Sequence, residues 1–228
     1  MTRLQSKRFL IAGGTGDVGS GIVGVLLAQG AEVVVPARTA EKADRLRAEV
    51  GGDRLVIIEG DVGTVEGAGR IAEQLTSPLD GVVASLGGWW QGPPLTAVPA
   101  ADWDAILAGN LTSHFAAARA FVPLLQARRG AYIQILGAAA EYPVPGSSLV
   151  SITAAAVAMM GRLMAAEHAE GTVRFRQVMI ASIVATRARD VIDASWVTAE
   201  DVGRVVADIL THPGQAAEVT RMELRQDA

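Results

Sequence analysis

A glycine-rich segment near the N-terminus most constrains what this chain can fold into. It separates the apolar run 8–12, which predicts a buried strand, from the apolar-rich segment 18–29, which predicts a helix. Glycines in such a turn let the backbone approach a pyrophosphate, and the following helix offers unpaired N–H groups and the positive end of its dipole. The segment therefore predicts a dinucleotide-binding turn, with a tight turn that holds no ligand as the alternative. The candidate contact residues are Gly13, Thr15, Gly16, Asp17, Val18 and Gly19.

Asp17 is the residue of this turn that argues against a bound phosphate. A carboxylate at the start of a helix can itself accept hydrogen bonds from the free N–H groups. Beside a phosphate it would repel the ligand. The turn therefore combines glycines that favour a dinucleotide with one acid that opposes it.

The end of the next predicted strand, 32–35, indicates which dinucleotide would bind. A carboxylate at this place would bind the ribose hydroxyls of NAD. Here the chain continues Pro36, Ala37, Arg38, and the planar guanidinium of Arg38 suits a 2′-phosphate. We therefore predict NADP(H) as the cofactor, with a solvated loop arginine as the alternative.

Strand-like and helix-like segments alternate along the remaining chain. Near-continuous apolar strands that alternate with helices are typical of a parallel sheet covered on both faces. No linker or repeat divides the chain, so we expect an α/β fold, a single Rossmann-type doubly wound domain over residues 1–228. The predicted strands are 8–12, 32–35, 55–58, 81–84, 132–136 and 173–180. The predicted helices are 18–29, 40–50, 65–75, 102–128, 149–169 and 198–210.

Charge and composition limit the classes of partner. The chain has 20 basic and 24 acidic residues and a net charge of −4, which argues against a surface that coats nucleic acid or anionic membrane. The long uncharged stretches 81–101 and 142–161 contain prolines and, in the second, hydroxyl residues, which disfavour a membrane span. No secretory signal opens the chain. We expect a cytoplasmic protein with a small-molecule substrate and no nucleic-acid or membrane partner.

On these features the chain resembles the short-chain dehydrogenase/reductase family over nearly its whole length. Asp61 and Val62, after the third strand, resemble the family's adenine-contacting pair. Segment 80–87 resembles the fourth strand and its Asn-Asn-Ala-Gly motif, of which only Gly87 is retained. The resemblance therefore implies cofactor contacts at Asp61, Val62, Ser85, Leu86 and Gly87.

The resemblance also implies one catalytic residue, and at one position the sequence departs from the family's glycine motif. Segment 103–115 resembles the helix that carries the family's catalytic asparagine, which would be Asn110, and segment 198–210 resembles its late helix. Asp17 stands where the commonest version of the glycine motif has a glycine. This spacing is similar to that of the family's atypical and extended branches, some of whose members are non-catalytic NADP sensors.

The family's catalytic serine and Tyr-x-x-x-Lys pair have no counterpart in this sequence. Alignment with the fifth strand places Gly137 at the serine, Val150 at the tyrosine and Ala154 at the lysine. Misalignment cannot explain this, because the only lysines, Lys7 and Lys42, precede the only tyrosines, Tyr132 and Tyr142. Hydride delivery to a carbonyl requires a donor near the oxygen, so another group would have to serve.

Three side chains are candidate replacements. Tyr142 lies on the loop that runs beside the substrate in the family, and Glu141 precedes it as a candidate general base. His114 lies one helical turn after Asn110, on the same helix face. Each has a structural alternative: packing for Tyr142, solvation for Glu141 and an interface position for His114. No group of residues with metal-binding spacing was found, so no metal is predicted.

Two further features concern the surroundings of the site. Trp89 and Trp90, on a Gly/Pro-rich loop after the fourth strand, predict an apolar pocket wall or lid, with core or subunit packing as the alternative. Only residues 187–194 remain for the substrate-covering loop. We therefore expect a site that is either open to solvent or covered by another subunit. The uncharged helix 149–164 matches the helix that commonly forms subunit contacts in the family, and it predicts a homo-oligomer, a dimer or a tetramer.

Three functions fit these observations. The first is an NADP-dependent oxidoreductase that acts on a small apolar carbonyl or enone through a non-standard proton donor. The second is a non-catalytic NADP(H)-binding sensor or structural partner. The third is a non-redox isomerase or lyase that uses Glu141, Tyr142 or His114.

Overall fold

The computed structural model describes residues 4–186, 193–212 and 214–223. Its main sheet has seven parallel strands in the order β3-β2-β1-β4-β5-β6-β9. Six of these strands were predicted, and the α/β fold with a parallel sheet is confirmed. The strands are β1 (Arg8–Ala12), β2 (Glu32–Ala37), β3 (Leu55–Glu59), β4 (Gly81–Ala84), β5 (Ala131–Gly137), β6 (Arg174–Ile180) and β9 (Val219–Met222).

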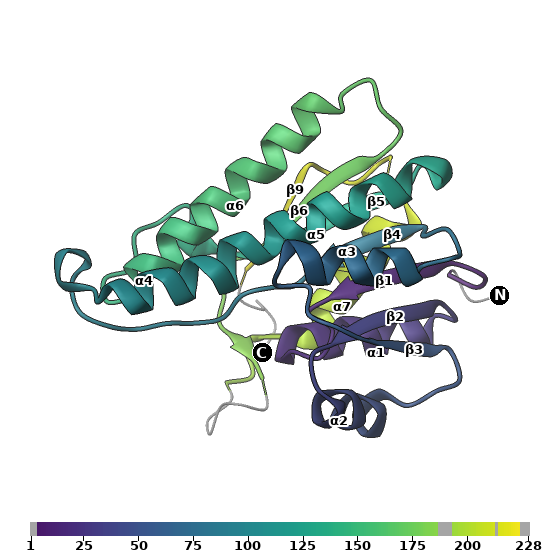
Figure 1. Cartoon of the computed structure of the whole chain (residues 1–228), viewed down its shortest axis with the longest axis horizontal. Coiled ribbons are helices and arrows are strands. Elements are labelled where there is room, and N and C mark those ends of the chain that lie inside the picture. The colour runs from purple at the N-terminus through teal and green to yellow at the C-terminus, as the bar shows by residue number, and fades with distance from the viewer. Residues whose placement is uncertain (1–3, 187–192, 213, 224–228) are drawn as a thin grey trace.

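Helices cover both faces of the sheet, as Figure 1 shows. Alternate residues of each strand enter two separate cores. Phe9 and Ile11 of β1 pack with α1 and α7, whereas Leu10 and Ala12 pack with α3 and α5. One face carries α1 (Asp17–Ala28), α2 (Ala40–Val50) and α7 (Ala199–Thr211). The other carries α3 (Val65–Gln74), α5 (Ser113–Phe121) and α6 (Ser148–Glu167).

The segment 102–128 is helical throughout, as predicted, but it is not one regular α-helix. The segment contains α4 (Ala100–Leu107), a π-helical turn (Ala108–Thr112), α5 and a 3₁₀ stretch (Val122–Arg128). A π turn carries one more residue than an α turn and re-aims the side chains around it, which is why such turns are frequent at functional sites. Asn110 lies at the centre of this turn.

Local sequence signals fixed several helix ends as expected. Thr198 caps α7 in a capping box with Asp201, whose carboxylate accepts from the Thr198 backbone N–H at 2.8 Å. Helix α2 ends at Gly51, which has a φ of 53°. Between β6 and α7, β7 (Val184–Ala185) pairs with β8 (Val197–Thr198). Of the predicted short covering loop, 187–192 lie outside the described residues.

Helix α6 is the one described helix that is long and apolar enough to cross a membrane. Of its most apolar window, 28% is buried inside the protein. Length and composition alone do not separate a membrane span from an apolar helix that packs on a sheet.

Candidate functional site

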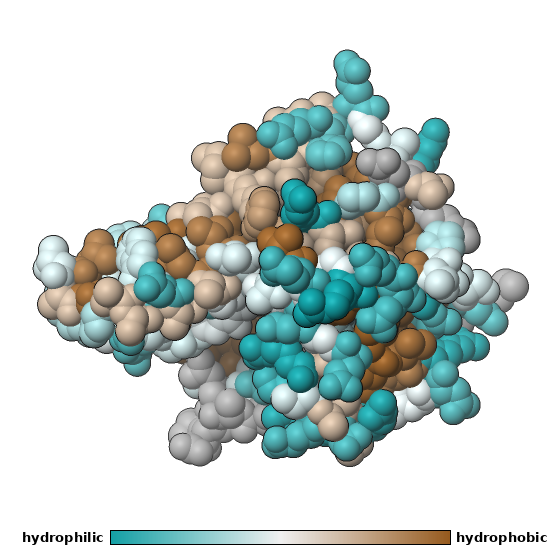
Figure 2. Space-filling model, viewed as in Figure 1, coloured by the Kyte–Doolittle hydropathy of each residue, from teal (hydrophilic) through white to brown (hydrophobic). Residues whose placement is uncertain are grey.

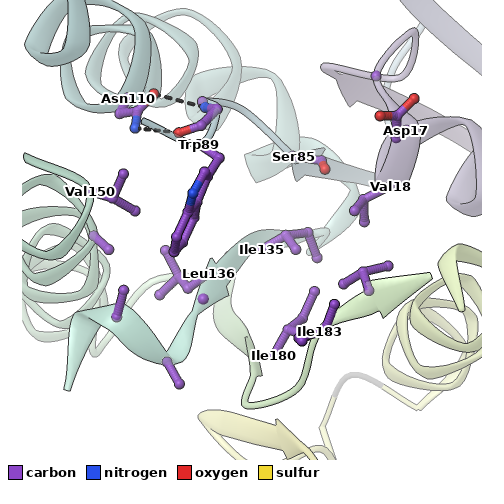
Figure 3. Close-up of a pocket in the computed structure, with 18 of the residues that line it drawn as sticks. Asp17, Val18, Ser85, Trp89, Asn110, Ile135, Leu136, Val150, Ile180 and Ile183 are labelled. Atoms are coloured by element: carbon purple, nitrogen blue, oxygen red, sulfur yellow. Dashed lines mark hydrogen bonds between the residues drawn. The ribbon is translucent and has the colours of Figure 1, made fainter. Parts of the chain in front are cut away.

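The carboxyl ends of five neighbouring strands, β2, β1, β4, β5 and β6, meet along one edge of the sheet. The glycine turn follows β1, Arg38 follows β2, and Ser85 follows β4. The loops after β5 and β6 complete this edge on the other side. Between these loops lies a cavity of about 1250 Å³, shown in Figure 3. In a doubly wound sheet this edge, where the strand order reverses, is where ligands bind.

The glycine turn is too closely packed to hold larger side chains. Gly13 has a φ of +83°, and a Cβ there would lie 1.9 Å from the carbonyl oxygen of Ser85. A Cβ on Gly19 would lie 2.1 Å from the carbonyl oxygen of Gly13. The N-cap of α1 is Gly16, which has no side chain to cap the first N–H groups. This tight cradle at a helix N-terminus fits the pyrophosphate of a dinucleotide.

The structure brings nine of the predicted site residues to the cavity wall. They are Gly16, Asp17, Val18, Gly19, Ser85, Leu86, Gly87, Asn110 and His114. The other predicted residues do not line it. They are Gly13, Thr15, Arg38, Asp61, Val62 and Tyr142.

Most of these outlying residues still lie at the strand ends beside the cavity. Arg38 is exposed directly after β2, and the guanidinium of Arg45 donates to the carbonyl oxygen of Thr15 at 3.0 Å. Asp61 accepts a hydrogen bond from the backbone N–H of Gly63 at 2.9 Å, and Val62 is buried. Two cations therefore lie near the ends of β1 and β2.

Asn110 holds the loop that follows β4. Its side-chain oxygen accepts from the backbone N–H of Gly88 at 2.8 Å, and its amide donates to the Gly88 carbonyl oxygen at 2.9 Å. These are the dashed lines in Figure 3. Gly87 has a φ of +96°, and a Cβ there would lie 3.0 Å from the Asn110 oxygen. The π turn and the loop after β4 are thus joined through one amide.

His114 is almost completely buried, with 2% of its surface exposed. Its Nε2 lies 3.3 Å from the carbonyl oxygen of Leu86 and must carry the proton, since a carbonyl only accepts. Its Nδ1 is buried with no hydrogen-bond partner among the described residues. Burial lowers the pKa of His114 to about 4, so the ring is neutral near pH 7.

The side chains of Glu141 and Tyr142 contact Arg221 and do not line the cavity. Glu141 forms an ion pair with Arg221 of β9, and the Arg221 guanidinium lies 5.9 Å from the centre of the Tyr142 ring. Tyr142 is 59% exposed. The expectation that Glu141 is only a solvated acid was therefore incomplete, since it anchors its loop to β9.

The end of the cavity away from the glycine turn is apolar. Val150 and Ala154 of α6 line it, as does Gly137 at the end of β5, the three positions that we predicted to align with the family's catalytic residues. Trp89 also lines the cavity, whereas Trp90 does not and donates its indole N–H to Asp102 at 3.2 Å. The prediction of a tryptophan wall therefore holds for Trp89 alone.

Several lining residues were not predicted from the sequence. They are side chains of ordinary strands and loops, so no motif marks them. Their one signal is position, because each lies at or just beyond the carboxyl end of β5 or β6, or on or directly before a strand of the short pair β7–β8. They include Ile135, Leu136, Ile180, Ile183, Val184 and Trp196.

The fold and the edge of the sheet that carries the cavity define an α/β protein of the Rossmann-like dinucleotide-binding class. A model of the short chain dehydrogenase family matches residues 7–195. The chain therefore belongs to the short-chain dehydrogenase family.

Individual relatives and structures agree with this membership. A cis-2,3-dihydrobiphenyl-2,3-diol dehydrogenase of Paraburkholderia xenovorans (strain LB400) is 28% identical over 174 residues, 73% of this chain and 62% of that protein. The chain spans about three fifths of the length of the first curated relatives that it matches. A short-chain dehydrogenase/reductase from Mycobacterium ulcerans superposes with a TM-score of 0.87 at 20% identity, over 96% of this chain and 89% of that one. The closed form of a serine dehydrogenase complexed with NADP⁺ superposes with a TM-score of 0.84 at 22% identity, over 94% of each chain.

Proposed function

We propose that this chain is an NADP-dependent oxidoreductase that reduces a small, uncharged carbonyl or enone substrate, with residues 1–228 acting as one dinucleotide-binding domain. The observation that carries the proposal is that one cavity joins the N-terminus of α1 to an apolar end lined by Val150 and Ala154. The glycine cradle suits a pyrophosphate, and the apolar end suits an uncharged substrate.

Different residues would bind the cofactor and position the loop beside the substrate in such a reaction. Gly13, Gly16 and Gly19 would hold the pyrophosphate, and Arg38 would bind a 2′-phosphate. A bound reduced nicotinamide would supply a hydride to the carbonyl carbon, and the carbonyl oxygen would have to receive a proton. Asn110 keeps the loop after β4 against the reacting end, through its two bonds to Gly88.

We propose water in the cavity as the proton source. The phenol of Tyr142 does not line the cavity, and the Asn110 amide is bonded to Gly88. His114 is neutral and uses its N–H on Leu86. A positioned general acid contributes about 10²–10⁴-fold to rate, so we expect slow turnover.

A titration with NADPH and NADH, followed by quenching of tryptophan emission, tests the cofactor part first. We expect saturable binding with NADPH preferred. A panel of uncharged aldehydes, ketones and enones, followed by NADPH absorbance, then tests the reaction. The reductase proposal is contradicted if NADPH does not bind, or if it binds and no member of the panel is reduced.

Binding of NADPH without turnover would support the second candidate function, a non-catalytic NADP(H)-binding sensor or structural partner. Val150 and Ala154 at the positions of the family's tyrosine and lysine favour this candidate. Turnover of a substrate without change at the nicotinamide would support an isomerase or lyase. The engagement of Glu141 and Tyr142 with Arg221 counts against those two residues as its acid–base groups.

The cofactor preference depends on Arg38 in this proposal. Because a hydrogen bond to a charged group is worth about 1.5–3 kcal/mol, Arg38→Ala should weaken NADPH binding about tenfold or more and leave NADH binding nearly unchanged. The two dissociation constants from the same titration give the ratio. Arg162→Ala, an exposed arginine of α6 far along the chain, is the control and should keep the parent ratio. An unchanged NADPH/NADH ratio in Arg38→Ala would contradict NADP preference through this residue.

The proposal includes a homo-oligomer, a dimer or a tetramer, formed through α5 and α6. Apolar side chains that are about half-exposed lie on these helices, and Figure 2 shows brown residues over this part of the molecule. They are Phe115, Ile152, Met159 and Leu163. An apolar surface of this kind is typical of a subunit contact.

A charge on this face should separate the subunits. Met159→Glu places a carboxylate on the exposed side of α6, and burying it unpaired in a contact is costly. We expect light scattering after size-exclusion chromatography to give the monomer mass for Met159→Glu and a dimer or tetramer for the parent chain. Val65→Glu, an exposed apolar residue at the start of α3, should keep the parent mass. A monomeric parent chain would refute the oligomer.

A further inference from the structure

Among the described residues, Trp89 is the most exposed of the large apolar side chains, at 64%, and yet it lines the cavity. An indole left this open to water gains little from packing in the unliganded protein. Figure 3 shows the ring extending from the loop after β4 toward Leu136, with Val150 on one side and Ser85 on the other. The ring therefore offers a face to whatever occupies this end of the cavity.

The backbone on both sides of Trp89 is anchored. Gly88 is held on its N–H and its carbonyl by Asn110. Trp90 is held through its indole N–H by Asp102, and a Cβ on Gly92 would lie 2.3 Å from the Trp90 ring. Since the residues before and after it are held, the backbone of Trp89 is presented in a set position beside the cavity.

The charge of the cavity limits what can lie on that face. Among the described residues that line it, the ionisable ones are Asp17 and His114, and there is no lysine or arginine. Figure 3 places Asp17 at the end of the cavity opposite Val150. Nothing among the described residues near Trp89 would compensate the negative charge of a carboxylate or phosphate on a substrate.

We propose that Trp89 is a stacking platform that selects substrates with a planar, uncharged, aromatic or conjugated ring, which lies between the indole and the aliphatic side chains of Leu136 and Val150. This inference deepens the proposed function and rests on it for the reaction. The binding of the ring itself depends only on the cavity. Stacking on an aromatic face adds about 0.5–1.5 kcal/mol beyond area burial, whereas a saturated ring of the same size gains burial alone.

The experiment compares three probes that cannot be reduced by NADPH: 2-naphthamide, its decahydro analogue and 2-naphthoate. Isothermal titration calorimetry is carried out with the full chain, with and without saturating NADPH. We expect 2-naphthamide to bind about 2- to 12-fold more tightly than the decahydro compound. The carboxylate should bind more weakly than the amide.

Variants assign the preference to Trp89. Trp89→Leu keeps an apolar side chain without a flat face and should abolish the difference between the aromatic and saturated amides, whereas Trp89→Phe should keep most of it. Trp103→Leu is the matched control, because Trp103 is a partly exposed tryptophan of α4 that does not line the cavity. It should bind all three probes as the parent does.

The outcomes separate this inference from the proposed function. Equal binding of the two amides, failure of both to bind, or an undiminished preference in Trp89→Leu would each overturn the platform. If 2-naphthamide shows the expected preference and NADPH does not bind, the platform stands and the NADP-dependent reaction is refuted. If NADPH binds and the protein binds the aromatic and the saturated amide with equal affinity, only the platform is refuted.

Discussion

Gly19→Ala should destabilise the protein by about 3 kcal/mol, the upper part of the usual range for overpacking, and should also abolish tight NADPH binding. The added Cβ would lie 2.1 Å from the Gly13 carbonyl oxygen and 2.8 Å from the Gly14 Cα. Both are backbone atoms, so no rotamer change can relieve the contact. Helix α1 would have to move away from the turn, and its first N–H groups would no longer point at a common site. Urea unfolding and the NADPH titration measure the two effects.

Gly24→Ala is the matched control in the same helix. Its Cβ would meet nothing closer than the Val50 Cγ1 at 3.5 Å, an ordinary contact. An alanine inside a helix is more stable than a glycine by about 0.5–1 kcal/mol, so this variant should gain stability and bind NADPH as the parent does. We therefore expect the free energy of unfolding to fall in Gly19→Ala and to rise in Gly24→Ala. A Gly19→Ala protein as stable as the parent would show that the turn is not the close-packed cradle described above.

The middle of the sheet and its β9 edge show what the sequence could predict of the fold. The strands around β1 are short apolar runs bounded by glycines and helices, so their buried, parallel character was readable. Strand β9 was missed because its pattern is alternately exposed and partly buried, and it contains Thr220 and Arg221 in place of an apolar run. It belongs to the sheet through its pairing with β6, a contact with a distant segment that no local pattern reveals.

The part of the candidate site that was predictable from the sequence is the glycine turn, where the backbone conformation requires glycine. Gly13 and Gly19 stand out in the sequence because their conformation or close packing excludes other residues. The contact of Tyr142 with Arg221, 79 positions further along the chain, was not predictable, because no local pattern indicates a partner so distant in the sequence. The π turn at Asn110 was also missed, since helical spacing of apolar residues looks the same with or without one extra residue.

The pH dependence of stability should carry a component from His114. Its pKa falls from 6.5 to about 4 on folding, because burial disfavours the charged ring. Between these two values the unfolded chain binds a proton that the folded protein does not, so stability falls as the pH falls. The contribution is absent above pH 6.5 and reaches about 3 kcal/mol of lost stability below pH 4.

His114→Leu isolates this component, because all other groups cancel when the variant is compared with the parent at each pH. Free energies of unfolding in urea should give a difference that is constant above pH 6.5 and shifts by about 3 kcal/mol in favour of the variant as the pH falls toward 4. A flat difference for His114→Leu would mean that the His114 ring takes up its proton in the folded protein over the same pH range as in the unfolded chain. That result would return His114 to the group of candidate acids beside the cavity.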